Sequence, residues 1–142
     1  MLKLKGIFKD QKIIYFLASM FVFGTAIGLY SGILNNYLHE ILSIGRFERG
    51  IIEFPRELPG LLLFVFMAML YRVSETKLIR IAFVVSLVGL AGLSIFGTYR
   101  IAAVVLIVLW STGEHLMMPV RQSIAIHAAV PGKTGLALGT SA

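Results

Sequence analysis

Three ionisable side chains stand close together where an uncharged run of the sequence begins. Glu53, Arg56 and Glu57 immediately precede residues 58–71, which carry no charge. Because residues three and four apart share one face of a helix, these side chains predict a charged stripe at one end of an apolar segment. The stripe is expected either to anchor the helix at the membrane–water interface or to line the mouth of a water-filled cavity, and the sequence leaves both open.

A second ionisable pair, Glu114 and His115, lies inside the apolar segment that follows Arg100. On a helix, Glu114 would lie roughly 21 Å from the start of that segment, within a hydrocarbon core about 30 Å thick. A carboxylate at that depth is costly unless it faces the protein interior and has a partner. The candidate partners are His115 and Arg121.

Glu114 is our first candidate for substrate contact or ion coupling. An acid beside an imidazole can take up and release a proton near neutral pH. The alternative is a structural pair that holds two helices together. Pro119 predicts a kink close to this pair, and Arg121 is expected to anchor the helix at the inner membrane interface.

The composition is that of a membrane protein. Hydrophobic residues make up 58% of the 142 residues and charged residues 14%, whereas soluble domains carry about 25% charged residues. The net charge of +6 comes from basic residues between apolar blocks, where topology and anionic lipid explain them better than nucleic acid does. We therefore expect the lipid bilayer, and no nucleic acid, as a partner.

Enzyme chemistry, cofactors and metal ions are not expected. The chain has no cysteine, which excludes disulfides and thiolate metal sites. No nucleophile–base arrangement and no metal-ligand spacing stands out in the sequence. Residues 131–135 resemble a phosphate-binding loop only in their Gly-Lys-Thr triplet, because His127 occupies the position that such a loop gives to glycine.

The apolar blocks predict an all-α fold, a transmembrane helix bundle that forms a single domain over residues 1–142. The predicted spans are residues 13–34, 53–73, 78–99 and 101–128, with a fifth starting at residue 134. The second span has to include the charged residues 53–57, because residues 58–71 alone would cover only roughly 21 Å. Since the fifth span begins without finishing, we expect the native chain to continue beyond Ala142.

The positions of lysine and arginine predict a cytoplasmic N-terminus. Several lysines precede the first span, and Arg72, Lys77 and Arg80 lie in or next to the link between the second and third, whereas only Arg100 lies between the third and fourth. Basic residues concentrate on the cytoplasmic side of membrane proteins. We expect a multi-pass protein of the cell membrane.

Small residues at helical spacing predict close helix packing. Gly24, Gly28 and Gly32 lie on one face of the first span, and Ser86, Gly89 and Gly92 lie on one side of the third. Faces of this kind let two backbones approach closely in a bilayer. A contact that slides during function is the alternative to a fixed packing face.

The layout resembles the N-terminal part of a major facilitator superfamily (MFS) transporter. The stretch GLYSGILNNYLHEIL resembles the end of that family's first helix and its outward loop. The stretch GEHLMMPVRQSIAIHAAVPGKTGLALG resembles its fourth helix, inner loop and the start of its fifth helix. The family's usual arginine in the fourth helix is not evident at the matching depth, where Glu114 and His115 stand.

The stretch MLYRVSETKLIR stands where the family has its cytoplasmic loop signature. It retains Arg72 and a basic Lys77, which are the loop-signature residues carried over from the resemblance. Tyr71 stands in place of the signature's aspartate, Ser74 in place of a glycine and Glu75 in place of an arginine. The resemblance thus leaves the family's cytoplasmic latch, which uses that aspartate, in doubt.

The resemblance implies a parent of about twelve helices in two halves, with a small-molecule substrate bound at the midplane between them. In such a half, the first, second, fourth and fifth helices line the cavity. Arg56, Glu57, Glu114 and His115 are then expected to be cavity or gate residues. The expected function is secondary active transport by alternating access, coupled to H⁺ or Na⁺, with the remainder of the chain completing the carrier.

Two other functions stay open. One is a small four-helix carrier that works as a dimer, like the small multidrug transporters, although these centre on an acid in the first helix and residues 13–34 contain none. The other is a membrane assembly subunit that transports nothing and binds a partner through its glycine face. The substrate is open as well, since Glu57 and Glu114 would suit a cation and Arg56 and Arg121 an anion.

Overall fold

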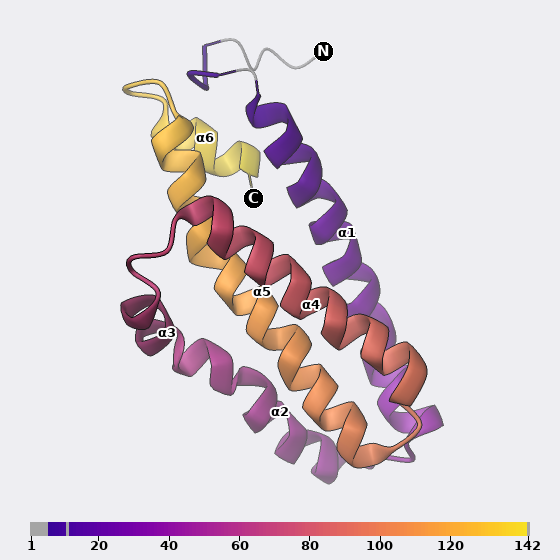
Figure 1. Ribbon diagram of the computed structural model, residues 1–142. Coiled ribbons are helices and arrows are strands. Elements are labelled where there is room, and N and C mark those ends of the chain that lie inside the picture. The colour runs from indigo at the N-terminus through magenta and orange to yellow at the C-terminus, as the bar shows by residue number, and fades with distance from the viewer. Residues whose placement is uncertain (1–5, 11, 142) are drawn as a thin grey trace. The chain divides into compact units, whose positions relative to one another are not determined.

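The computed structural model describes residues 6–10 and 12–141, and these form helices joined by short links. In chain order the elements are α1 (Ile13–Asn36), a π-helical turn (Tyr37–Ile41), α2 (Arg46–Leu61), α3 (Leu63–Met69), α4 (Glu75–Phe96), α5 (Arg100–Ala128) and α6 (Thr134–Ser141) (Figure 1). Among these residues, Phe8 and Ala129 also form an isolated antiparallel β-bridge. The all-α prediction is confirmed for the described part of the chain.

Three helical segments are long and apolar enough to cross a membrane. They are Ile13–Ile41, Glu75–Phe96 and Arg100–Ala128, and they overlap the predicted spans 13–34, 78–99 and 101–128. The predicted span 53–73 is not among them, because this part of the chain is divided between α2 and α3. The membrane character of the protein therefore rests on three helices, and the count of four spans stays a prediction.

The charged residues 53–57 lie in the middle of α2, which begins at Arg46. Pro55 and Pro59 both lie inside this helix, and the interruption falls after them, at Leu62. Among the residues of α2 only Pro59 is buried, so its ring packs against neighbouring residues at a point where the helix lacks one backbone donor.

The chain divides into two compact units, which we describe separately. The terminal unit comprises Met1–Ile33 and Arg121–Ala142, and the bundle unit comprises Leu34–Val120. Helix α5 runs unbroken through Pro119 from the bundle unit into the terminal unit. The kink predicted at this proline stays a prediction.

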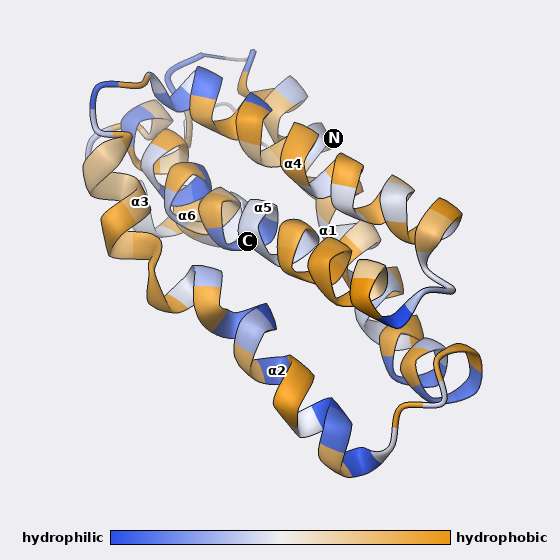
Figure 2. Cartoon of the chain, turned by 60° about the horizontal axis from the view of Figure 1, so that its bottom comes forward, coloured by the Kyte–Doolittle hydropathy of each residue, from blue (hydrophilic) through white to orange (hydrophobic). Residues whose placement is uncertain are grey.

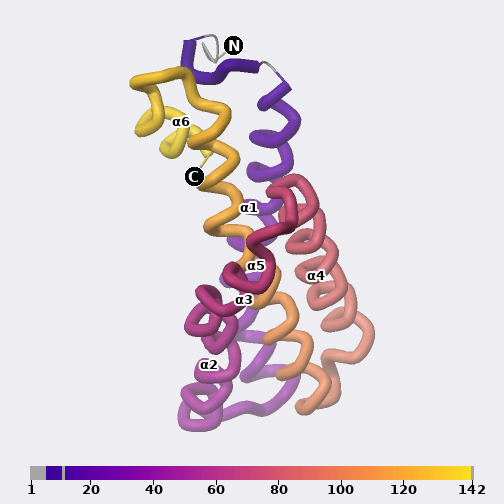
Figure 3. Tube along the Cα trace, turned by 60° about the vertical axis from the view of Figure 1, so that its left-hand side comes forward, coloured from indigo at the N-terminus to yellow at the C-terminus, as the bar shows by residue number. Residues whose placement is uncertain are grey.

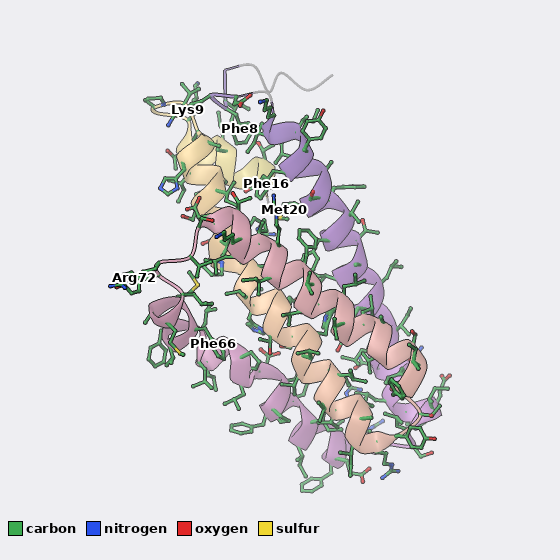
Figure 4. All side chains as sticks on the ribbon, in the orientation of Figure 1. Phe8, Lys9, Phe16, Met20, Phe66 and Arg72 are labelled. Carbon is green, nitrogen blue, oxygen red and sulfur yellow. The ribbon has the colours of Figure 1, made fainter. Side chains whose placement is uncertain are left out.

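In the terminal unit, the segment before α1 pairs with the link between α5 and α6. The backbone N–H of Lys9 donates to Ala128 O at 2.9 Å, and that of Val130 donates to Ile7 O at 2.8 Å. Phe8, labelled with Lys9 in Figure 4, is buried in an apolar cluster with Ile13, Ala129 and Ala137. These contacts join segments that are far apart in the sequence.

In the bundle unit, α5 lies between α2 and α4 (Figures 1 and 3). Helix α4 is antiparallel to α5, since Gly89 lies against Trp110 and Ser86, earlier in α4, lies against Gly113. Helix α2 is parallel to α5, since Glu48 lies near Arg100 at the start of both helices, and Glu57, later in α2, lies near His115, later in α5. Helix α5 is thus the central element of this unit.

The predicted small-residue face of α4 is a packing face. A Cβ atom added at Gly89 would lie 2.5 Å from the backbone nitrogen of Trp110. The neighbouring positions Ala103 and Ile107 on α5 are fully buried. By contrast, a Cβ atom at Gly24, Gly28 or Gly32 of α1 would meet nothing within 4 Å, so the packing role of that face stays a prediction.

The start of α5 is tied to the start of α2. Arg100 donates from Nε to Leu42 O at 2.9 Å and from Nη2 to Ser43 O at 3.0 Å, and its Nη1 lies 3.5 Å from Glu48 Oε1. The second oxygen of Glu48 accepts the Gly45 backbone N–H at 2.9 Å, so this side chain caps the first turn of α2. Arg100 therefore fixes the level at which both helices begin.

Replacing Gly89 with alanine should weaken the packing between α4 and α5. The new methyl group would meet the backbone of α5, which cannot rotate away, so we expect the free energy of unfolding to fall by about 1–3 kcal/mol. The matched control is Gly24→Ala, which should leave it unchanged or raise it by up to about 1 kcal/mol, because alanine is the better helix former. Detergent-induced unfolding of both variants measures this, and equal stability of the two would contradict the close approach.

Candidate functional site

Helix α2 turns its charged face toward α5 and its apolar face outward. Phe47, Ile51 and Phe54 are exposed, Phe47 by 83%, whereas the Arg56 side chain is only 29% exposed. Figure 2 shows hydrophilic and hydrophobic residues alternating around this helix. An amphipathic helix of a soluble protein has the opposite arrangement, so the orientation of α2 fits a lipid surrounding, in which charged side chains face the interior.

Arg56 bridges two carboxylates on the inward face of α2. Its Nε lies 2.7 Å from Glu53 Oε2, and its Nη2 lies 2.7 Å from Glu57 Oε1. The spacing of three residues and of one residue brings both acids to the same guanidinium. One cation thus serves two anions.

The network continues from α2 to α5 through Glu57 and Ser111. Glu57 Oε2 lies 3.4 Å from His115 Nε2. The buried hydroxyl of Ser111 donates to the backbone carbonyl of Arg56 at 2.5 Å. His115 and Ser111 are four residues apart on α5, so both reach α2 from the same face.

The network lies deep in the predicted span. Ser111 and His115 lie roughly 16 and 22 Å along the helix from Arg100, at 1.5 Å per residue. Both positions are inside a hydrocarbon core about 30 Å thick if α5 begins near its edge. The ion pairs of α2 lie at the same level, because α2 and α5 are parallel and begin together at Arg100 and Glu48.

Gly60 makes room for the imidazole of His115. A Cβ atom at Gly60 would lie 2.6 Å from His115 Cδ2 and 2.7 Å from Nε2. On its other side the ring is held by Ser111, whose backbone oxygen lies 2.9 Å from Nδ1. Sequence reasoning missed Gly60 and Ser111; the only signal for Ser111 was its position one turn before His115.

Glu114 adjoins this network on α5. It is partly buried, and it lies within range of the charges of His115, Arg56 and Glu57 and of the Trp110 indole. The expected partner His115 is therefore a neighbour, and Arg56 of α2 is a second one. The structure brings together five of the six predicted substrate or coupling residues: Glu53, Arg56, Glu57, Glu114 and His115.

The other predicted residues lie elsewhere. Arg121 belongs to the terminal unit. Arg72 lies in the link between α3 and α4 (Figure 4), where its Nε donates to the hydroxyl of Tyr71 at 2.6 Å and its guanidinium lies 5.2 Å from the ring centroid. Lys77 is exposed in the first turn of α4. Arg72 thus contacts the residue that stands in place of the family's aspartate.

Comparison with known proteins neither supports nor contradicts the MFS resemblance. Models of protein families, curated protein sequences and solved structures gave no match to this chain. Within residues 6–10 and 12–141, no group of three or more His, Asp or Glu side chains is arranged to hold a metal ion. The site is therefore described by its own chemistry, that of a partly open ion-pair network around an imidazole.

Replacing Gly60 with alanine should displace His115 from Glu57. The methyl group would occupy the place of the ring, so we expect a loss of about 1–3 kcal/mol in the free energy of unfolding. Gly50→Ala is the matched control on the same helix, because a Cβ atom there would meet nothing within 4 Å. In a His115→Ala background the effect of Gly60→Ala should vanish, and an undiminished effect in this double-mutant cycle would contradict the contact.

Proposed function

We propose that this chain is the N-terminal part of a secondary active transporter of the MFS type, which moves a small solute by alternating access. The observation that carries the proposal is the network of Glu53, Arg56, Glu57 and His115 between α2 and α5. Ionisable residues within membrane spans are costly and mark substrate and ion pathways. If α5 begins near the edge of the hydrocarbon core, this network lies at the depth expected of a binding site near the bilayer midplane, which supports the proposal.

The openness of the network favours a functional role over a purely structural one. The Glu57 side chain is 50% exposed although it contacts both Arg56 and His115. Ion pairs that only hold two membrane helices together are expected to be enclosed by packing, because exposure to lipid is unfavourable for a carboxylate. A half-exposed carboxylate at this depth is suited to contact with water or with a bound solute.

The charges of the site do not select one solute class. Glu53, Glu57 and Glu114 would bind a cation, whereas Arg56 would bind an anion once it exchanges one of its two carboxylates. Competition between a solute and an internal ion pair is a simple way for binding to change the contact between two helices. The proposal therefore names the mechanism and the site and leaves the solute open.

A membrane assembly subunit without transport activity is the second candidate. The observation that favours it is the face of α1 formed by Gly24, Gly28 and Gly32, where a Cβ atom would meet nothing within 4 Å. Such a face suits close contact with another transmembrane helix. In an assembly subunit, however, we do not expect the site around Glu57 to become accessible from both sides of the membrane.

Thiol labelling distinguishes the two functions without knowledge of the solute. Residues 1–142 contain no cysteine, so Glu57→Cys provides a single reactive thiol in a complete gene product from which the cysteines outside this part are removed. In alternating access, we expect a membrane-impermeant maleimide to label it from the outside and from the inside, using vesicles of each orientation.

Phe54→Cys is the matched control on α2. Phe54 is on the exposed apolar face, and a thiol in lipid does not form the reactive thiolate, so it should stay unlabelled from both sides. Labelling of Glu57→Cys from neither side, or from one side only under all conditions, would contradict alternating access.

A further inference from the structure

The hydrogen bonds of Ser111 determine which of its neighbours are donors. A serine hydroxyl has one hydrogen to donate. The carbonyl oxygen of Arg56, 2.5 Å from Ser111 Oγ, can only accept. The hydroxyl hydrogen is therefore used for Arg56, and Ser111 Oγ is left as an acceptor toward His115.

His115 Nδ1 faces two acceptors. It lies 2.9 Å from the backbone oxygen of Ser111 and 3.0 Å from Ser111 Oγ. The opposite tautomer would place a nitrogen lone pair against a carbonyl oxygen, which is unfavourable. Nδ1 therefore carries a hydrogen, and this assignment follows from the hydrogen-bond partners alone.

His115 Nε2 then faces Glu57 Oε2 across 3.4 Å. In a neutral imidazole with its hydrogen on Nδ1, Nε2 is an acceptor, and an ionised carboxylate is also an acceptor. Two acceptors in this position repel each other unless a proton lies on one of them. We propose that Glu57 and His115 together bind one proton, and that this proton is the coupling ion of the transport function proposed above.

The surrounding charges favour a bound proton. The charged group of α2 that contacts His115 is Glu57, which also contacts Arg56, and Glu114 adjoins His115 on α5. Glu53 contacts Arg56 in turn. The cluster thus holds three carboxylates and the guanidinium of Arg56, with Arg49 one turn before Glu53 on the same face of α2. Because the carboxylates outnumber the cations, protonation of the pair brings the cluster closer to neutrality. The charged residues of α4, the other helix packed on α5, are Glu75, Lys77 and Arg80, all in its first two turns.

Binding and release involve one proton and no other reactant. A hydronium ion transfers its proton to His115 Nε2 and leaves as water, which gives an imidazolium beside the Glu57 carboxylate. The proton can shift to Glu57 Oε2 with no change in total charge, and release to water reverses the uptake. After release, Nε2 and Oε2 repel each other, so the contact between α2 and α5 beside Gly60 loses its attraction.

Nitrogen NMR of the full chain, labelled with ¹⁵N-histidine in detergent micelles, tests the proposal. The chain has three histidines, namely His39, His115 and His127, and His115→Gln identifies the signal of His115. At neutral pH we expect one of two results, according to which partner holds the proton. If His115 holds it, both ring nitrogens are protonated. If Glu57 holds it, Nδ1 alone is protonated, and an infrared band of a protonated carboxyl group appears that Glu57→Gln removes. A neutral His115 with its hydrogen on Nε2 would overturn the proposal, and so would Nδ1 protonation without the carboxyl band.

Glu57→Gln and Glu53→Gln form a matched pair, because both remove a carboxylate that contacts Arg56 at 2.7 Å. If the proton is on His115, Glu57→Gln should give neutral His115 with its hydrogen on Nδ1, since the new amide can donate to Nε2. Glu53→Gln should leave His115 doubly protonated. An equal effect of both variants would assign the proton to the cluster as a whole and contradict a site shared by Glu57 and His115.

The wild-type spectrum decides the tautomer, so a hydrogen on Nε2 alone overturns the proposal whether or not Glu57→Gln or Glu53→Gln folds. The test also needs no transport. A shared proton without two-sided labelling of Glu57→Cys would keep the proton site and remove the carrier function. Two-sided labelling with the wrong tautomer would keep the carrier and remove the proton as the ion held by this pair.

Discussion

The constraint on which the bundle unit depends is that charged side chains in an apolar solvent have to face protein. Helix α2 carries Glu53, Arg56 and Glu57 close to large exposed apolar residues such as Phe54. Only one orientation of the helix satisfies both groups in a bilayer, with the charges toward α5 and the aromatic ring toward lipid. This orientation has three consequences. Helix α5 becomes the central helix, its polar residues contact the charges of α2, and residue 60 has to be glycine to make room for His115.

Helix α5 meets this constraint by dividing its surface between two neighbours. Ser111 and Gly113 are two residues apart and so point about 200° from each other around the helix. Gly113 lies against Ser86 of α4, in a contact of small residues, whereas Ser111 donates to Arg56 of α2. The close approach to α4 leaves no room for side-chain adjustment on that side, so any rearrangement in this unit has to occur on the polar side, between α5 and α2.

The sequence predicted the helices well where an apolar run alone determines them, and less well where a helix is amphipathic. The spans 13–34, 78–99 and 101–128 overlap the long apolar helices, and five of the six predicted site residues lie together. For residues 46–69 the pattern of charges does not reveal where the helix begins or that it continues past Pro59, because both depend on packing against α5. The glycine spacings of α1 and α4 look equivalent in the sequence, yet only Gly89 and Gly92 have a close neighbour, since spacing defines a face but not its partner.

The interaction between Glu57 and His115 differs from the other contacts of the unit because a bound proton decides whether it is attractive or repulsive. The packing of Gly89 against α5 is the same in every protonation state, and Arg100 keeps its backbone acceptors whatever the state of the site. The pair, in contrast, attracts with the proton and repels without it, while Arg56 holds Glu57 on α2 in both cases. Helix α2 is therefore fixed to α5 from the Arg100 end as far as the hydrogen bond of Ser111 to Arg56 O, and conditionally attached one turn further on, near Gly60. A helix held at one end and released at the other tilts about the fixed end, which is the kind of motion that opens one side of a membrane site at a time.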